Sequence, residues 1–238
     1  MRLEQEIKFY FARLGADVCG IASVDRFTEA PAGFHPRDLY ADCRSAILFG
    51  QALPRGTLSV DSRLLYLKGM TECLAELDRI AFLGSAWIER RGGVAVPLPS
   101  DSPYEHWDAE RSTARGLLSL KHAAELAGLG RIGKSTLLIN RQFGNRLMLG
   151  CMLTNLSVQS DAIAEVICLP DCRICLDGCP QHALDGQSVD QKQCRELIYG
   201  TNARGFVVNN CNRCRRLCPQ AMRYPKPATS WPTRAELT

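Results

Sequence analysis

Two copies of one cysteine motif constrain this chain more than any other feature. The copies read Cys172-x2-Cys175-x3-Cys179-Pro180 and Cys211-x2-Cys214-x3-Cys218-Pro219. Eight of the twelve cysteines fall within residues 168–218, because Cys168 precedes the first copy and Cys194 lies between the two. Thiols with a purely structural role are not clustered in this way, whereas thiolates that hold a metal cluster are.

The motif assigns the eight thiols to two 4Fe–4S clusters. Two thiolates separated by two residues bind one cube, whereas the cysteine before proline ligates the other cluster, as in two-cluster ferredoxins. One cluster would take Cys168, Cys172, Cys175 and Cys218, and the other Cys179, Cys194, Cys211 and Cys214. Three residues rather than the usual two separate Cys168 from Cys172, so this ligand depends on how the loop at Pro170 bends. Structural zinc is the alternative, although zinc motifs do not require Cys-Pro twice.

The rest of the composition indicates a globular protein. The 238 residues are 46% hydrophobic and 23% charged, which allows one large domain with a small module. No apolar run reaches the roughly 18 residues of a membrane-spanning helix, and the start, MRLEQEIK, is charged. We therefore expect a cytoplasmic protein without membrane contact, whose clustered thiols hold metal rather than form disulfides. Four further cysteines lie in apolar surroundings and are expected to be buried: Cys19, Cys43, Cys73 and Cys151.

The positive charge has a simple explanation in the predicted clusters. The formal net charge is +4, and residues 191–238 hold nine Lys or Arg against two acidic residues. A 4Fe–4S cluster with four thiolates carries about −2, so two clusters would cancel the excess. Basic residues that offset cluster charge are therefore favoured over a nucleic-acid surface.

Hydrophobic spacing predicts an α/β domain followed by a cysteine-rich module. We expect helices over 3–14, 62–90 and 112–127, strands over 17–23, 45–51, 94–98, 135–140 and 145–155, and the module over 164–225. The loop at 99–110 is polar, interrupted by proline, and long enough to be functional.

A glycine-rich loop, GLGRIGKS at 128–135, matches both the P-loop and the dinucleotide-binding patterns. Both mechanisms need a strand before the loop and a helix after it. Here the periodicity predicts the reverse order, which argues against both. We instead expect Gly128, Gly130 and Gly133 to allow close approach of a flat cofactor or a neighbouring element. A turn that ends the preceding helix is the structural alternative.

The segment KHAAELAGLGRIGKSTLLI at 121–139, followed by a double cluster module with an intervening cysteine, resembles the epoxyqueuosine reductase family and its short iron–sulfur relatives. GADVCGIASVDRF and AVPLPSDSPY are also similar to the short relatives. The parent family pairs a nitroreductase-like α/β domain, which holds cobalamin, with a ferredoxin-like domain that carries two 4Fe–4S clusters. The resemblance implies a cofactor domain at 1–160, a cluster domain at 161–225 and a tail at 226–238.

The resemblance also implies site residues. In the family the clusters pass electrons to the corrinoid while an aspartate upstream of the glycine loop donates a proton, and Asp101 is its nearest match here, the alternative being a solvated loop residue. Tyr104 is a second candidate donor, or simply packs over the loop. His122 would contact the cofactor or lie in the core, and Lys134 would bind a corrinoid amide or phosphate, or cap a carbonyl.

The resemblance implies that the protein is a reductase of a small molecule or modified nucleoside, and that a flavodoxin- or ferredoxin-type protein donates its electrons. Full-length members continue with a helical-repeat region that helps to hold tRNA, whereas this chain ends twenty residues after Cys218, so tRNA is a doubtful partner. Two alternatives stay open. One is an electron-transfer protein without cobalamin, and the other is a flavin-using reductase.

Overall fold

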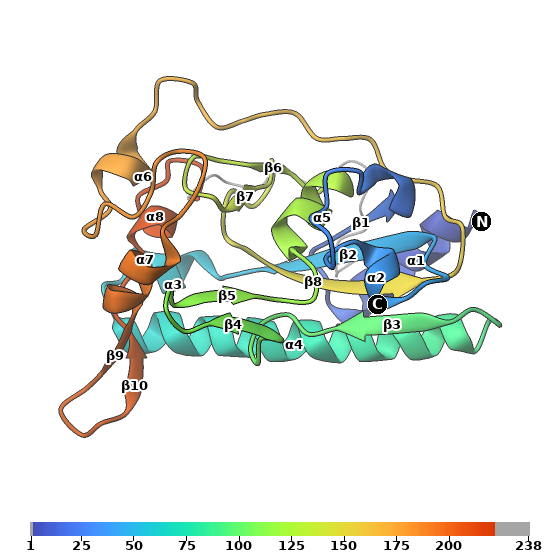
Figure 1. Cartoon of the computed structure of the whole chain (residues 1–238), viewed down its shortest axis with the longest axis horizontal. Coiled ribbons are helices and arrows are strands. Elements are labelled where there is room, and N and C mark those ends of the chain that lie inside the picture. The colour runs from blue at the N-terminus through green and yellow to red at the C-terminus, as the bar shows by residue number, and fades with distance from the viewer. Residues whose placement is uncertain (1, 222–238) are drawn as a thin grey trace.

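The computed structural model describes residues 2–221 and is shown in Figure 1. The elements of the N-terminal part are α1 (Leu3–Leu14), β1 (Val18–Ser23), the 3-10 helix η1 (Val24–Arg26), α2 (Pro36–Leu39), β2 (Ser45–Ala52), α3 (Arg55–Ser59), α4 (Arg63–Glu89), β3 (Ala95–Leu98), β4 (His106–Asp108), β5 (Thr113–Arg115), α5 (Leu120–Leu126), β6 (Arg131–Ile132), β7 (Leu138–Ile139) and β8 (Leu147–Thr154). The cysteine-rich part adds α6 (Ile174–Asp177), α7 (Gln191–Ile198), β9 (Tyr199–Thr201), β10 (Val207–Asn209) and α8 (Arg213–Arg216).

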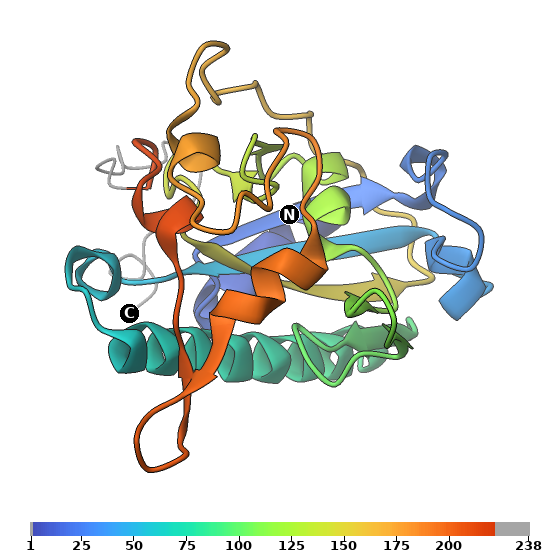
Figure 2. The same cartoon turned by 60° about the vertical axis from the view of Figure 1, so that its left-hand side comes forward.

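The centre of the molecule is a sheet with the order β1-β2-β8-β3, in which every pairing is antiparallel. Side chains alternate between its two faces. Ile47 and Phe49 pack with α1 and α4, whereas Ala46 and Leu48 pack with α5 and the glycine loop. The helices therefore cover both faces of the sheet, and Figure 2 shows α4 and α5 on opposite sides of it.

Most of the predicted elements are present. The helix over 3–14 is α1, the long helix is α4, and the strands over 17–23, 45–51, 94–98 and 145–155 correspond to β1, β2, β3 and β8. The start of α4 has a physical cause, since the Ser62 hydroxyl accepts a hydrogen bond from the Leu65 N–H at 3.3 Å. The four isolated cysteines are buried, as expected.

Two expectations about the middle of the chain are wrong. The helix expected over 112–127 is reduced to α5, and its first part is instead β5, which pairs with β4. The side chain of Gln191 bonds both backbone groups of Ala114, at 3.0 Å to its N–H and 3.3 Å to its carbonyl oxygen, and thereby favours the extended form. The strand expected over 135–140 shortens to β7, which pairs antiparallel with β6, and each of the two strands has only two residues.

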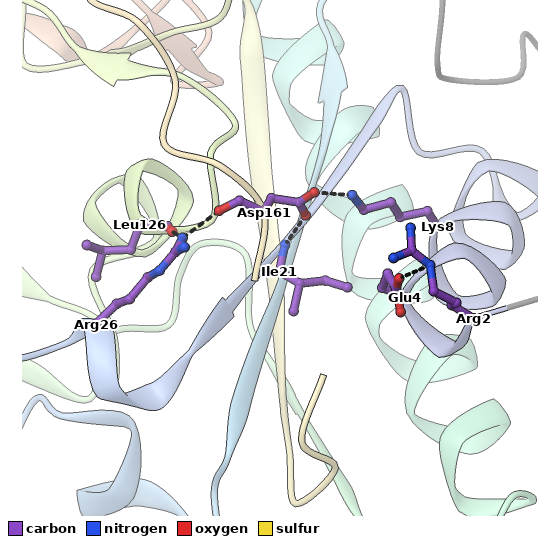
Figure 3. Close-up of polar contacts among 7 residues, drawn as sticks. All are labelled: Arg2, Glu4, Lys8, Ile21, Arg26, Leu126 and Asp161. Carbon is purple, nitrogen blue, oxygen red and sulfur yellow. Dashed lines mark hydrogen bonds and ion pairs between the residues drawn. The ribbon is translucent and has the colours of Figure 1, made fainter. Parts of the chain in front are cut away.

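The chain leaves the sheet after β8 and is held against the N-terminal elements at Asp161 (Figure 3). The Asp161 carboxylate accepts hydrogen bonds from the Ile21 N–H at 2.9 Å and from Lys8. Arg26 donates to the carbonyl oxygens of Leu126 and Asp161, both at 2.7 Å. These bonds fix the end of α5, and thus the glycine loop, relative to the segment that leads into the cysteines.

No helix among residues 2–221 is long and apolar enough to cross a membrane. The expected tail at 226–238, together with the last four residues of the expected cluster domain, lies outside the described residues.

Candidate functional site

The structure sorts the eight clustered cysteines into two groups of four. We call Cys168, Cys172, Cys175 and Cys218 the first thiol group, and Cys179, Cys194, Cys211 and Cys214 the second thiol group. Burial raises the pKa of Cys175, and the thiols of Cys218, Cys168 and Cys172 raise it further. Each of these partners belongs to the first group. The cysteine that precedes Pro219 thus lies with the thiols of the other motif.

The second thiol group shows the same pattern. Burial raises the pKa of Cys214 to about 11, with further contributions from Cys211, Cys194 and Cys179. Burial also raises the pKa of Cys194, and Cys211 and Cys179 add to the rise. Cys194, which lies between the two motifs in the sequence, is therefore brought to the second group by α7.

The two motifs interlock through their short helices. α6 carries Cys175, α8 carries Cys214, and the two helices lie side by side. Gly178 makes this approach possible, because a Cβ at this position would lie 2.5 Å from the Leu217 Cδ1 atom. A larger residue would displace the Leu217 side chain and would also meet the Ile174 carbonyl oxygen at 2.8 Å, so the end of α6 would have to move.

The thiol groups have the chemistry of iron–sulfur ligands. All twelve cysteines are free. Among the described residues, no three His, Cys, Asp or Glu side chains lie close enough together to hold a single metal ion. The four iron corners of a cubane take one thiolate each and need a wider arrangement.

Buried polar atoms beside Cys214 also fit a charged group. Arg215 is 7% exposed, and its guanidinium bonds the Asn145 carbonyl oxygen. Within residues 2–221, Arg215 Nε, Asn145 Oδ1 and Gln220 Oε1 are buried without a hydrogen-bond partner. A buried cation next to four thiols would offset the negative charge of a bound cluster.

The glycine loop is packed against protein. Gly128 has φ +74° and ends α5, with the Gly128 N–H bonding the Glu125 carbonyl and the Leu129 N–H bonding the Ala124 carbonyl. A Cβ on Gly130 would lie 2.4 Å from the Ile139 carbonyl oxygen. The loop therefore approaches neighbouring elements. A helix, α5, precedes it, and the loop itself contains β6 and leads into β7, so the helix comes before the loop and a strand after it, as the order of the sequence predicts.

Lys134 and Gly133 connect the glycine loop to the first thiol group. Lys134 Nζ donates to the carbonyl oxygen of Cys172 at 3.0 Å and to that of Pro170. A Cβ on Gly133 would lie 3.5 Å from the Cys168 sulfur. Of the two roles expected for Lys134, the structure shows the carbonyl cap, which holds the irregular Cys168–Cys172 turn in place.

His122 is exposed on α5, so the expectation of a core histidine is wrong. Its Nδ1 atom lies 2.6 Å from the Ser119 hydroxyl. Partial desolvation, followed by the charge of Lys121, lowers the pKa of its imidazole. A neutral, accessible ring at this place is free to contact a bound molecule.

The two candidate proton donors lie together. The Tyr104 hydroxyl donates to the Asp101 Oδ1 atom at 3.1 Å. Burial, then the charge of Asp101, raises the pKa of Tyr104 to about 12, so the phenol stays protonated at neutral pH. Both residues line a cavity of about 360 Å³ formed by residues 98–101, 103–105, 116–118 and 120. This volume is within the range of small-molecule sites.

Arg195 is the site residue that the sequence analysis missed. It follows Cys194 on α7, and its guanidinium lies over the rings of Tyr104, Trp107 and Tyr199. The sequence holds no signal for this arrangement beyond the position next to a cysteine, because Arg195 and Tyr104 are 91 positions apart in the chain.

A second cavity of about 550 Å³ lies between residues 110–113 and 182–193, along the start of α7, and was not predicted either.

The chain is similar in sequence to epoxyqueuosine reductases. No protein-family model matches the chain. It is 25% identical to the epoxyqueuosine reductase of Bacillus anthracis over an alignment 261 positions long, gaps included, which covers 92% of this chain and 64% of that protein. The chain thus spans less than two thirds of the length of this curated relative.

Solved structures show a shared fold. An epoxyqueuosine reductase with an epoxyqueuosine-modified tRNA stem-loop aligns with a TM-score of 0.61 at 19% identity, covering 94% of this chain and 67% of that one. The Bacillus subtilis enzyme, whose aspartate-bearing catalytic loop is swung out of the active site, gives the same TM-score, identity and coverage. A reductive dehalogenase linked to B12-dependent dehalogenation gives 0.66 at 22% identity, covering 90% and 30%. The resemblance expected from the sequence is thereby confirmed.

Proposed function

Because the chain is a relative of the epoxyqueuosine reductases, we propose that it is an iron–sulfur oxidoreductase in which two 4Fe–4S clusters deliver electrons to a corrinoid for a reductive reaction. The observation that carries the proposal is the sorting of eight thiols into two groups of four. Each cysteine that precedes a proline lies with the thiols of the other motif, which is the arrangement of two-cluster ferredoxins.

The donor set fits the clusters. The first thiol group would hold one cluster and the second thiol group the other, and both clusters would supply single electrons. Arg215 beside Cys214 and the Lys134 cap on the Cys172 carbonyl would hold the ligand loops in place. The proposal includes the organisation implied by the sequence, with a nitroreductase-like α/β domain at 1–160 and a ferredoxin-like domain at 161–225.

The corrinoid part of the proposal rests on the relatives. One structural neighbour is a dehalogenase linked to B12-dependent chemistry. The glycines and Lys134, which were expected to contact the corrinoid, instead contact protein carbonyls and side chains, so they do not fit that role. When bound, a corrinoid would supply a redox centre between the clusters and the substrate.

The residues of this chain supply the proton. The Asp101 carboxylate accepts the Tyr104 hydroxyl hydrogen and thereby orients the phenol at the cavity. Since the pKa of Tyr104 is raised to about 12, the hydroxyl keeps its proton at neutral pH, and it would release that proton only to a substrate atom that has become a stronger base than the phenolate. The Bacillus subtilis relative also carries an aspartate on its catalytic loop, which supports a role for Asp101.

We propose a modified nucleoside as the substrate, since the curated relative is named for epoxyqueuosine. The sequence makes tRNA a doubtful partner, but a structural neighbour holds a modified tRNA stem-loop. The free nucleoside and the tRNA-borne nucleoside are therefore both included in the substrate test. The electron donor in the proposal is a flavodoxin- or ferredoxin-type protein.

Metal content tests the proposal directly. The chain would be purified without oxygen, reconstituted with iron, sulfide and hydroxocobalamin, desalted and assayed for each metal and for flavin. We expect about eight irons and one cobalt per chain. Eight irons without cobalt would favour an electron carrier or, with flavin absorbance, a flavin-using reductase. Fewer than about four irons would overturn the cluster assignment.

A further inference from the structure

Arg195 lies where the loop that carries Asp101 and Tyr104 meets the helix that carries Cys194. The guanidinium carbon is 5.5 Å from the ring centre of Tyr104, 5.2 Å from that of Trp107 and 5.4 Å from that of Tyr199. A guanidinium within about 6 Å of an aromatic face is attracted to it. Three rings from two separate parts of the chain thus converge on one cation.

Hydrogen bonds reinforce this junction. Arg195 Nη1 donates to the Tyr199 hydroxyl at 3.2 Å, and Nη2 donates to the Gln191 Oε1 atom at 3.5 Å. Gln191 in turn bonds both backbone groups of Ala114 in β5. The helix α7 is therefore attached to Tyr104 and Trp107 in the loop through Arg195, and to β5, which follows the loop, through Gln191.

Within residues 2–221, α7 has few other attachments: the Asn210 N–H donates to the Ile198 carbonyl oxygen at 2.9 Å, and Lys192 donates to the Glu110 carbonyl oxygen at 3.3 Å. The helix has eight residues, and none of them is buried. A helix of this length is marginal by itself, and most helices in proteins depend on a buried apolar face for their stability. The helix therefore depends on these bonds, on the Asp190 cap, on its contacts to the loop and on ligation of a cluster by Cys194.

We propose that Arg195 is a positioning residue, which holds the loop of Asp101 and Tyr104 in place only while Cys194 is bound to its cluster. The loop that presents the proton donor is then ordered by the same helix that helps to hold the second cluster. Assembly of that cluster completes the proton-donating site. This inference rests on the proposed function, since it takes Cys194 as a ligand.

Hydrogen exchange followed by mass spectrometry tests the inference without any need for activity. The full chain with both clusters would be compared with Arg195→Ala and Arg195→Lys, and iron would be measured in each sample. We expect amides in residues 99–110 of Arg195→Ala to exchange about tenfold faster at unchanged iron. Arg195→Lys should be intermediate, because it retains a cation but loses the planar fork. Gln193→Ala, an exposed position on the same helix, should match the parent chain.

Removal of the clusters provides the second arm. In the parent chain stripped of iron, both α7 and residues 99–110 should exchange faster, and Arg195→Ala should add no further increase in the loop. A loop that exchanges like the parent in fully loaded Arg195→Ala, or that stays protected in the stripped chain, would overturn the inference. If Arg195→Ala loses iron, the comparison rests on fully loaded Arg195→Lys, and parent-like exchange there also overturns it.

The two proposals fail in different ways. A parent chain that binds no iron contradicts the proposed function. A parent chain with about eight irons whose loop does not respond to Arg195 substitution contradicts only the positioning role.

Discussion

Asp161 and Ile21 exchange two hydrogen bonds across 140 positions of sequence. The Asp161 N–H donates to the Ile21 carbonyl oxygen at 2.9 Å, and the Ile21 N–H donates to the Asp161 Oδ2 atom at the same distance. Lys8 binds the other carboxylate oxygen (Figure 3). A single side chain thus joins α1, β1 and the segment that leads into the cluster module.

Asp161→Ala should lower the free energy of unfolding by about 2–4 kcal/mol. The substitution leaves the N–H of the fully buried Ile21 without an acceptor and removes the partner of Lys8. Urea unfolding of the chain with its clusters loaded measures the change. Glu165→Ala is the matched control, since the Arg141–Glu165 pair is more than 80% exposed on both sides and should matter by less than about 0.5 kcal/mol. Equal effects of the two substitutions would contradict the role of Asp161.

Cys194→Ala should reduce iron from about eight to about four per chain, because it removes one ligand from the second thiol group alone. Iron and acid-labile sulfide report the change. Cys73→Ala removes a cysteine outside both groups and should keep the full iron content. Unchanged iron in Cys194→Ala would show that Cys194 is not a ligand.

ATP should not raise the melting temperature of the protein. The P-loop pattern at 128–135 is preceded by α5, contains β6 and leads into β7, so it does not run into a helix whose N-terminus could bind phosphate. Lys134 is also engaged by the carbonyl oxygens of Pro170 and Cys172. Thermal unfolding with and without millimolar Mg-ATP tests this expectation, and a clear rise in melting temperature would revive the nucleotide-binding hypothesis.

Tyr104 should remain protonated well above the pH at which an ordinary tyrosine ionises. Its pKa is raised from 10.0 to about 12, mainly by burial and then by the charge of Asp101, so the neutral phenol is retained as the pH rises through 10. The ultraviolet difference between the parent chain and Tyr104→Phe should therefore show no phenolate at pH 10.5. Asp101→Asn should lower the pKa of Tyr104 while leaving it above 10, since burial is the larger cause.

Turnover should depend on the protonated form of Tyr104. If Tyr104 donates the proton, Tyr104→Phe should lower turnover by about 10²–10⁴-fold, and the parent chain should show no alkaline loss from Tyr104 below about pH 11. Reduction of the modified nucleoside over pH 7–10, with reduced flavodoxin as the electron source, provides the measurement. Full turnover by Tyr104→Phe would assign the proton to another group.

The sequence by itself determined the elements whose signal is local. The three- and four-residue spacing of apolar side chains placed α1 and α4, the Ser62 cap placed the start of α4, and the apolar runs placed β1, β2 and β8. The spacing also predicts two groups of four cysteines, and the thiols that shift the pKa of Cys175 and of Cys214 come from those same groups. The repeated Cys-Pro motif encodes that grouping, since each copy has the same local geometry.

Only the tertiary structure decided the features that depend on distant partners. Residues 113–115 form β5 rather than helix because Gln191 supplies the backbone of Ala114 with two hydrogen bonds. The glycines lie against carbonyl oxygens and side chains that their own segment does not reveal, such as the Ala162 carbonyl oxygen beside Gly128. Arg195 meets Tyr104 and Trp107 because the fold brings α7 to the loop. Periodicity and spacing report local geometry, whereas these contacts join segments separated by tens of residues, and packing alone selects them.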